Sequence, residues 1–182
     1  MRKADFTDRI RPGMRIAITV GSRGVANVAL ITRTVVDYVK ACDAEPFIVP
    51  AMGSHGGATA IGQRKIVEDY GCTEEYLGCP ICSSMEVVPI GVNDAGQQVF
   101  IDKYAAQADG IIVNCRVKPH SAFRGKYESG IMKMMAIGLG KQYGAEVCHN
   151  QGIGCMAKNI PLFGRCILKN APVLFAVAAI EN

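Results

Sequence analysis

Short apolar runs rich in β-branched residues recur along the chain, and the stretches between them place apolar residues at helical spacing. A short apolar run bounded by turn residues is typical of a strand buried on both faces of a sheet. We therefore predict four buried strands, at residues 15–20, 46–51, 110–115 and 173–180.

Helices are predicted between these strands. Asn27 is the expected N-cap of the first helix, because a short polar side chain can accept a backbone N–H there. A second, polar helix is expected to open at Thr59 and to end at Gly71, a residue suited to the turn after a helix. Two more helices are expected: one begins at about Ser129, which is its expected N-cap, and the other spans residues 155–169.

Two further strands, near residues 86–90 and 98–102, are joined through Asn93-Asp94-Ala95-Gly96, which predicts a β-hairpin. Strands that alternate with helices favour a mainly parallel sheet with helices on both faces. The sequence therefore predicts a single α/β domain over residues 1–182, Rossmann-like, with the hairpin added. In such sheets ligands bind outside the carboxyl ends of the strands.

Composition narrows the class of protein. Hydrophobic residues make up 49% and charged residues 20%, which are globular values, and the formal charge is +4. A mildly basic chain without charge runs suits a small anionic ligand, and we expect no nucleic-acid partner. No apolar run is long enough for a membrane span, so no membrane association is expected.

The cysteines indicate a reducing compartment. All eight are scattered, and the N-terminus has no apolar stretch of signal-peptide type, so we expect free thiols and a cytoplasmic location. Cys79 and Cys82 are the one close pair. A zinc site needs about four ligands, and no second pair completes one here. A metal or redox role for this pair stays open.

Glycine-rich loops follow the first two predicted strands and precede helices. The first is Gly21-Ser22-Arg23-Gly24, and the second contains Gly53, Gly56 and Gly57. Glycine lets the backbone approach a ligand closely, and free amides at a helix start attract anions. The alternative is that these glycines only make turns. Two such loops at one sheet edge favour a shared anion site.

Two of the three histidines, His55 and His120, lie in loops after predicted strands, where a parallel sheet would bring them together. Imidazole is the side chain best suited to move protons near neutral pH. A solvated loop histidine is the alternative for each. The pair therefore gives candidate acid/base groups.

Lys133 stands among large apolar residues in the helix predicted from Ser129. Its stem could simply cover the core while the amine reaches solvent. Alternatively, burial lowers the pKa of the amine and frees it to form a covalent bond. Sixteen residues on, Cys148-His149 offers a sulfur and a nitrogen to a metal ion.

Taken in order, these motifs resemble those of the nickel-dependent lactate racemase family. The matching residues extend over most of the chain: Ser22-Arg23, Gly53-Ser54-His55, Pro119-His120 with Phe123 and Gly125, Lys133, and His149. The resemblance implies an isomerase, a racemase or epimerase that acts on a small 2-hydroxy acid by hydride transfer.

The resemblance also implies a cofactor, the nickel-pincer nucleotide (a pyridinium-3,5-bisthiocarboxylate mononucleotide). Lys133 would hold it covalently, and His149 would complete the nickel coordination. His55 and His120 would be the general acid/bases on opposite faces of the substrate. Arg23 would hold a carboxylate or phosphate, and Ser22 and the glycines at 53, 56 and 57 would contact the cofactor.

The chain departs from the family at several places. Val20-Gly21-Ser22 stands where the family has an acidic residue ahead of the arginine, and the context of Lys133 is richer in methionine. The family's C-terminal lid domain is missing from these residues, so a further segment or a homo-oligomer is expected to complete the site. Two readings stay open beside the racemase: a non-catalytic nucleotide- or anion-binding module, and a zinc or iron–sulfur protein that uses the cysteines.

Overall fold

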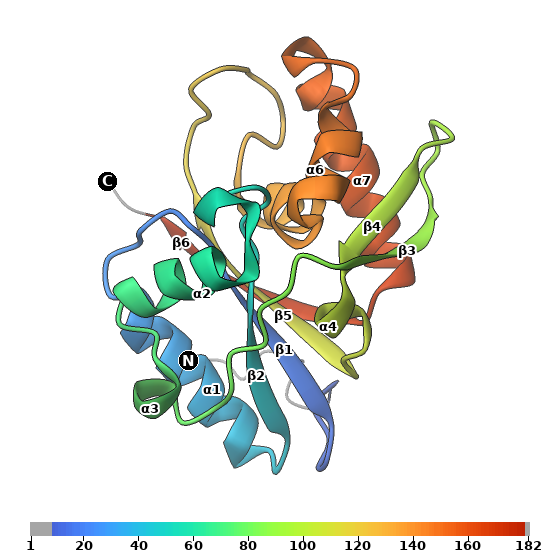
Figure 1. Cartoon of the computed structure of the whole chain (residues 1–182). Coiled ribbons are helices and arrows are strands. Elements are labelled where there is room, and N and C mark those ends of the chain that lie inside the picture. The colour runs from blue at the N-terminus through green and yellow to red at the C-terminus, as the bar shows by residue number, and fades with distance from the viewer. Residues whose placement is uncertain (1–8, 181–182) are drawn as a thin grey trace.

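The computed structural model describes residues 9–180, and its centre is a parallel sheet of four strands. The strand order is β2 (Glu45–Pro50), β1 (Arg15–Val20), β5 (Gly110–Val117) and β6 (Val173–Ile180). Figure 1 shows the strands side by side, with helices packed around them. The predicted α/β class and the mainly parallel sheet are confirmed.

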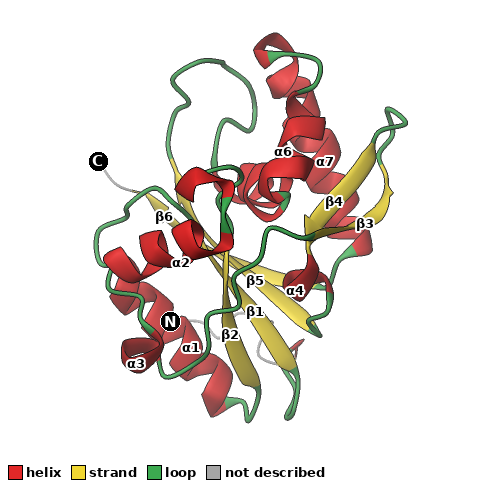
Figure 2. Cartoon of the chain, viewed as in Figure 1, coloured by secondary structure: helices red, strands yellow, loops and turns green. Residues whose placement is uncertain are grey.

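Strand residues alternate between two apolar cores, as the two-residue period of a strand requires. Ile16, Ile18 and Ile112 face the core under α1 (Val28–Ala41), α2 (Ala60–Asp69) and α3 (Glu74–Leu77). Ala17 and Val113, on the other face, lie in the core under α5 (Gly130–Lys133), α6 (Lys141–His149) and α7 (Met156–Asn170). Both faces of the sheet are therefore covered by helices (Figure 2).

The predicted hairpin is present, but it forms a separate antiparallel sheet of β3 (Val87–Val92) and β4 (Gln98–Asp102). The short helix α4 (Lys103–Ala106) follows β4. Two short 3₁₀ helices, η2 (Gly56–Ala58) and η4 (Ile153–Cys155), precede α2 and α7. The hairpin packs against α6 and α7. Sequence patterns did not predict α3 or α4, each only one turn long.

Thr59 caps α2 as predicted, because its hydroxyl accepts the Gly62 N–H at 3.0 Å. Asn27 precedes α1 but adopts a left-handed conformation with no side-chain cap, so its predicted capping is wrong. Ser129 does not cap its helix either. Its hydroxyl instead accepts the Lys118 N–H at 2.7 Å and donates to the Lys118 carbonyl oxygen at 2.5 Å.

The strand predicted as buried at the end of the chain, β6, is an edge strand. Most of its side chains are only partly buried, and Ile180 is 76% exposed. Its apolar run therefore reflects contact with one neighbour, β5, rather than burial on both sides. Within residues 9–180 every helix is too short or too polar to cross a bilayer.

Candidate functional site

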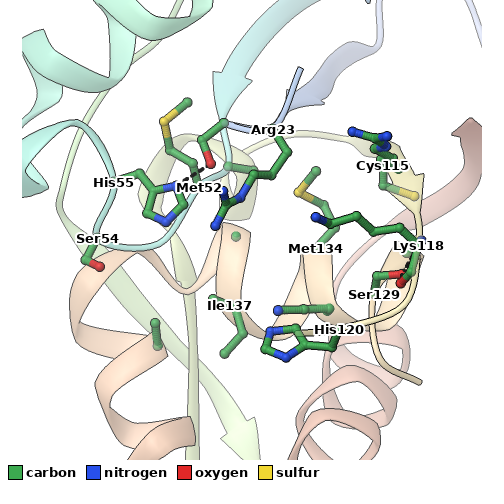
Figure 3. Close-up of a pocket in the computed structure, with 18 of the residues that line it drawn as sticks. Arg23, Met52, Ser54, His55, Cys115, Lys118, His120, Ser129, Met134 and Ile137 are labelled. Carbon is green, nitrogen blue, oxygen red and sulfur yellow. Dashed lines mark hydrogen bonds between the residues drawn. The ribbon is translucent and has the colours of Figure 1, made fainter. Parts of the chain in front are cut away.

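A cavity of about 540 Å³ lies at the carboxyl ends of β1, β2 and β5, where the fold predicts ligands to bind. It brings together residues that are far apart in the sequence: Ser22, Arg23, His55, His120, Lys133 and His149. Figure 3 shows Arg23 and His55 on one side of this space and Lys118 and His120 on the other.

The loop after β1 is held from both sides. Tyr70, directly after α2, donates its hydroxyl to the Ser22 carbonyl oxygen at 2.7 Å, and Arg116 on β5 donates to that of Gly24 at 3.0 Å. Beneath the loop, a Cβ on Gly21 would lie 2.8 Å from the methyl group of Met134. The backbone that carries Arg23 is therefore fixed, while its side chain is exposed at the cavity.

His55 is oriented by Ser22, whose hydroxyl forms a hydrogen bond with Nδ1 of the imidazole (Figure 3). A hydroxyl can either donate or accept, so this contact permits both neutral tautomers of His55. Partial burial, and then the nearby charges of Arg23 and Lys133, lower the pKa of His55. The imidazole of His55 therefore stays neutral at a lower pH than the imidazole of a free histidine.

Two glycines of the second loop, Gly53 and Gly56, are packed closely against neighbouring residues, whereas a Cβ on Gly57 would meet nothing within 4 Å. Gly53, Gly56 and Gly57 all have positive φ and do not line the cavity. A Cβ on Gly56 would lie 2.6 Å from the backbone carbon of Gly62, so this loop approaches α2 too closely for a side chain. Their predicted contact with a cofactor stays a prediction, and the turn that they make is what places His55.

His120 is held by its own loop. Glu128 accepts the His120 N–H at 2.9 Å and the Gly125 N–H at 3.0 Å, while Nδ1 of His120 accepts the Ala122 N–H at 3.1 Å. Since Nδ1 is an acceptor, neutral His120 carries its proton on Nε2. Burial and the charge of Lys133 lower its pKa, and these outweigh the opposing effect of Glu128.

Lys133 is the last residue of α5 and is half-buried at the cavity wall. Its Nζ lies 5.8 Å from the centre of the Phe123 ring, which in turn packs against His120 with ring centres 4.3 Å apart. Burial, followed by the charges of Arg23 and Lys118, lowers the pKa of the Lys133 amine. More of this amine is therefore uncharged and nucleophilic than in an exposed lysine.

His149 ends α6 and lines the same cavity. Its Nδ1 lies 2.6 Å from the Ala145 carbonyl oxygen, and since a carbonyl only accepts, Nδ1 must donate. In neutral His149 the other ring nitrogen, Nε2, therefore has a free lone pair, the arrangement typical of histidine ligands of metals. Cys148 is fully buried in the core, so the predicted Cys148-His149 metal corner is wrong.

The other cysteines form no metal cluster. All eight are free thiols, and residues 9–180 contain no group of three or more His, Cys, Asp and Glu side chains placed to hold a metal ion. Burial raises the pKa of Cys79 to about 11. Its thiol is therefore protonated at neutral pH and is a weak nucleophile.

Sequence patterns did not single out several cavity residues. Arg116 lies near the end of β5, and Lys118 directly follows this strand, two residues before the candidate acid/base residue His120. Both could have been predicted as site residues, because they are cations at the end of a buried strand, and strand ends carry ligand-binding residues in this fold class. With Arg23 and Lys133 they make the cavity predominantly cationic, and Glu146 is an opposing charge in its wall.

The π-helical segment η3 (Met134–Leu139) follows Lys133 and lies close under the sheet edge. A Cβ on Gly138 would lie 2.7 Å from the Ala51 carbonyl oxygen, a backbone atom that cannot easily move. We expect Gly138→Ala to lower the free energy of unfolding by about 1–3 kcal/mol, measured by urea denaturation. Gly154→Ala is the control, because a Cβ there meets nothing within 4 Å. Equal stability of the two variants would contradict this close packing.

A family model for the domain of unknown function DUF362 matches residues 19–180, and the chain therefore belongs to this family. None of the curated proteins compared matches it. Among solved structures, the lactate racemase apoprotein from Thermoanaerobacterium thermosaccharolyticum is similar, with a TM-score of 0.64 and 14% identity. That match covers 100% of this chain and 46% of the racemase chain, so this chain spans less than half of its length. At this identity the likeness shows a shared fold.

Proposed function

We propose that this protein is a racemase or epimerase of a small 2-hydroxy acid and uses a nickel-pincer nucleotide held on Lys133. The observation that carries the proposal is the convergence of two histidines, a half-buried lysine with a lowered pKa and a third histidine with a free Nε2 on one cationic cavity. The fold shared with a lactate racemase apoprotein supports the same reading.

The cavity residues fit the proposed cofactor. Lys133 offers an amine for a covalent link, and His149 offers a nitrogen lone pair to nickel. Arg23 and Lys118 offer positive charge to a phosphate or carboxylate, and the cavity volume of about 540 Å³ is in the usual range for ligand sites. When bound, the group supplies a reversible hydride acceptor.

The protein's own groups would bind the substrate and move its proton. Arg23 would hold the carboxylate of the 2-hydroxy acid. His55 would take the hydroxyl proton in one direction, since its contact with Ser22 permits a free Nε2. His120 would hold the substrate oxygen through its Nε2–H, and the Ala122 contact must open before its Nδ1 can take up a second proton.

Replacement of either histidine should slow the reaction in both directions, because a racemase passes its substrate through the same groups each way. We expect His55→Gln and His120→Gln each to lower kcat by about 10²–10⁴-fold, the usual contribution of an acid/base group. The measurement is the interconversion of D- and L-lactate and of other enantiopure 2-hydroxy acids by cofactor-loaded protein, followed by chiral chromatography.

Each histidine has a matched neighbour as its control. Ser54 and Ser121 line the cavity beside His55 and His120 and are exposed, so Ser54→Ala and Ser121→Ala should retain activity. Full activity in a histidine variant would remove that residue from the reaction. Wild-type protein that carries nickel and the adduct but racemises no 2-hydroxy acid would refute the proposed function.

A further inference from the structure

Lys141 is a fully buried lysine that does not line the cavity. It is the first residue of α6, separated from η3 only by Gly140, and has a φ of +53°, a conformation that a residue with a side chain rarely adopts. Strained backbone of this kind persists only where the surrounding contacts enforce it, and it clusters at functional sites. The contacts of Lys141 show what enforces it here.

The ammonium of Lys141 joins three separate segments. Its Nζ donates to the Pro50 carbonyl oxygen at the end of β2 and to Oε1 of Gln63 on α2, the latter at 2.9 Å. It also lies 3.3 Å from Oδ2 of Asp102, itself fully buried at the end of β4. The other oxygen, Oδ1 of Asp102, accepts the N–H groups of Tyr104 and Ala105.

Gln63 extends this network to the candidate site. With its oxygen engaged by Lys141, its amide Nε2 donates to the carbonyl oxygens of Gly53 at 2.7 Å and His55 at 3.2 Å. The loop is also joined to η3, because Gly53 N–H donates to the Gly138 carbonyl oxygen at 3.3 Å. A short chain of contacts therefore runs from the buried cation to the backbone of His55.

The other end of the network reaches the opposite side of the cavity. Lys141 begins the helix that ends at His149 and follows the segment that begins after Lys133. We propose that Lys141 is a positioning residue, which fixes the His55 loop relative to the helix that carries His149. The inference rests on the proposed function for the roles of the two histidines, while the network itself does not depend on it.

Gln63→Leu tests the link without removing the buried ion pair. NMR titration of the three histidines, assigned with single His→Gln variants, reports on His55 without any turnover. Because partial burial in the fixed loop lowers the pKa of His55, a loosened loop should move its titration midpoint up toward the ordinary value of 6.5. The His120 midpoint should stay at its wild-type value, since His120 has no contact with Gln63.

Val67→Ala is the matched control. Val67 is buried on the same helix, in the apolar core between the sheet and α1, α2 and α3, and it takes no part in the Lys141 network. It should lower stability without moving the His55 midpoint. Should Gln63→Leu fail to fold, Gln63→Glu keeps an oxygen for Lys141 but removes both N–H donors to the loop, and the same shift is expected. An unmoved His55 midpoint in the folded Gln63 variant, or an equal shift in Val67→Ala, would overturn the proposal.

Cofactor-loaded protein gives the second measurement. Misplacement of a catalytic group by about 1 Å can cost roughly 100-fold in rate, so we expect Gln63→Leu to lower kcat by about 10- to 100-fold with KM nearly unchanged. The two proposals fail separately. A shifted His55 midpoint in a protein whose wild type never racemises would remove the racemase function and keep the positioning role.

Discussion

Lys133→Ala is expected to abolish both the covalent adduct and racemisation in protein from cells that make the nickel-pincer nucleotide. The alanine has no amine, whereas the half-buried Lys133 amine has a lowered pKa and is available for a covalent bond. Intact-mass analysis measures the adduct, metal analysis measures nickel, and chiral chromatography measures activity. All three should fall to background in this variant.

Lys118→Ala is the matched control, because Lys118 is a second lysine of the same cavity but is exposed and follows β5. The adduct should persist in this variant. An adduct that survives Lys133→Ala would place the covalent link on another residue. Wild-type protein that binds a nucleotide but never acquires an adduct would support the non-catalytic binding module instead.

Lys141→Met should give the largest loss of stability, about 3–5 kcal/mol in the free energy of unfolding, because it leaves Asp102 charged and unpaired in the core. Burial already raises the pKa of Asp102 above 3.8 and Lys141 opposes this rise, so the variant should raise it further. A carboxyl with a raised folded-state pKa stabilises the fold at low pH and loses this contribution as pH rises through that pKa. The defect should therefore shrink in acid.

Urea denaturation between pH 4 and 8 measures this effect. The double variant Lys141→Met with Asp102→Asn removes both charges at similar volume and should recover most of the lost stability. If Lys141→Met were as stable as wild type at pH 8, the pair would contribute nothing to the fold. If the double variant were no better than the single one, the loss would come from packing rather than from the unpaired charge.

The sheet and its longer helices could be predicted because their apolar periodicity is strong, whereas the one-turn helices α3 and α4 are too short to show it. The four parallel strands are found close to residues 15–20, 46–51, 110–115 and 173–180, and Thr59 and Gly71 mark the ends of α2 as predicted. The burial of β6 was overestimated because an apolar run does not reveal whether a strand has one neighbour or two. Asn27 and Ser129 were expected to cap helices. Instead, Asn27 adopts a left-handed backbone conformation, and the Ser129 hydroxyl forms hydrogen bonds with the backbone of Lys118.

The candidate site was predictable to the extent that its residues follow strands. His55 and His120 come together because parallel strands present their carboxyl ends at one edge. Lys141 could not be found this way, since a buried lysine in sequence resembles a surface lysine until Asp102 and Gln63 are placed against it. The free Nε2 of His149 likewise depends on a hydrogen bond that only the structure reveals.

The two anchors of the loop after β1, from Tyr70 and Arg116, bear on the thermodynamics of ligand capture. A loop immobilised before the ligand arrives has little backbone entropy left to lose. Ordering on this side of the cavity is then confined to the Arg23 side chain, a cost of about 0.5–1.5 kcal/mol for one flexible residue. Calorimetry of anion binding should accordingly show a small entropic penalty, and removing the Tyr70 hydroxyl should enlarge it.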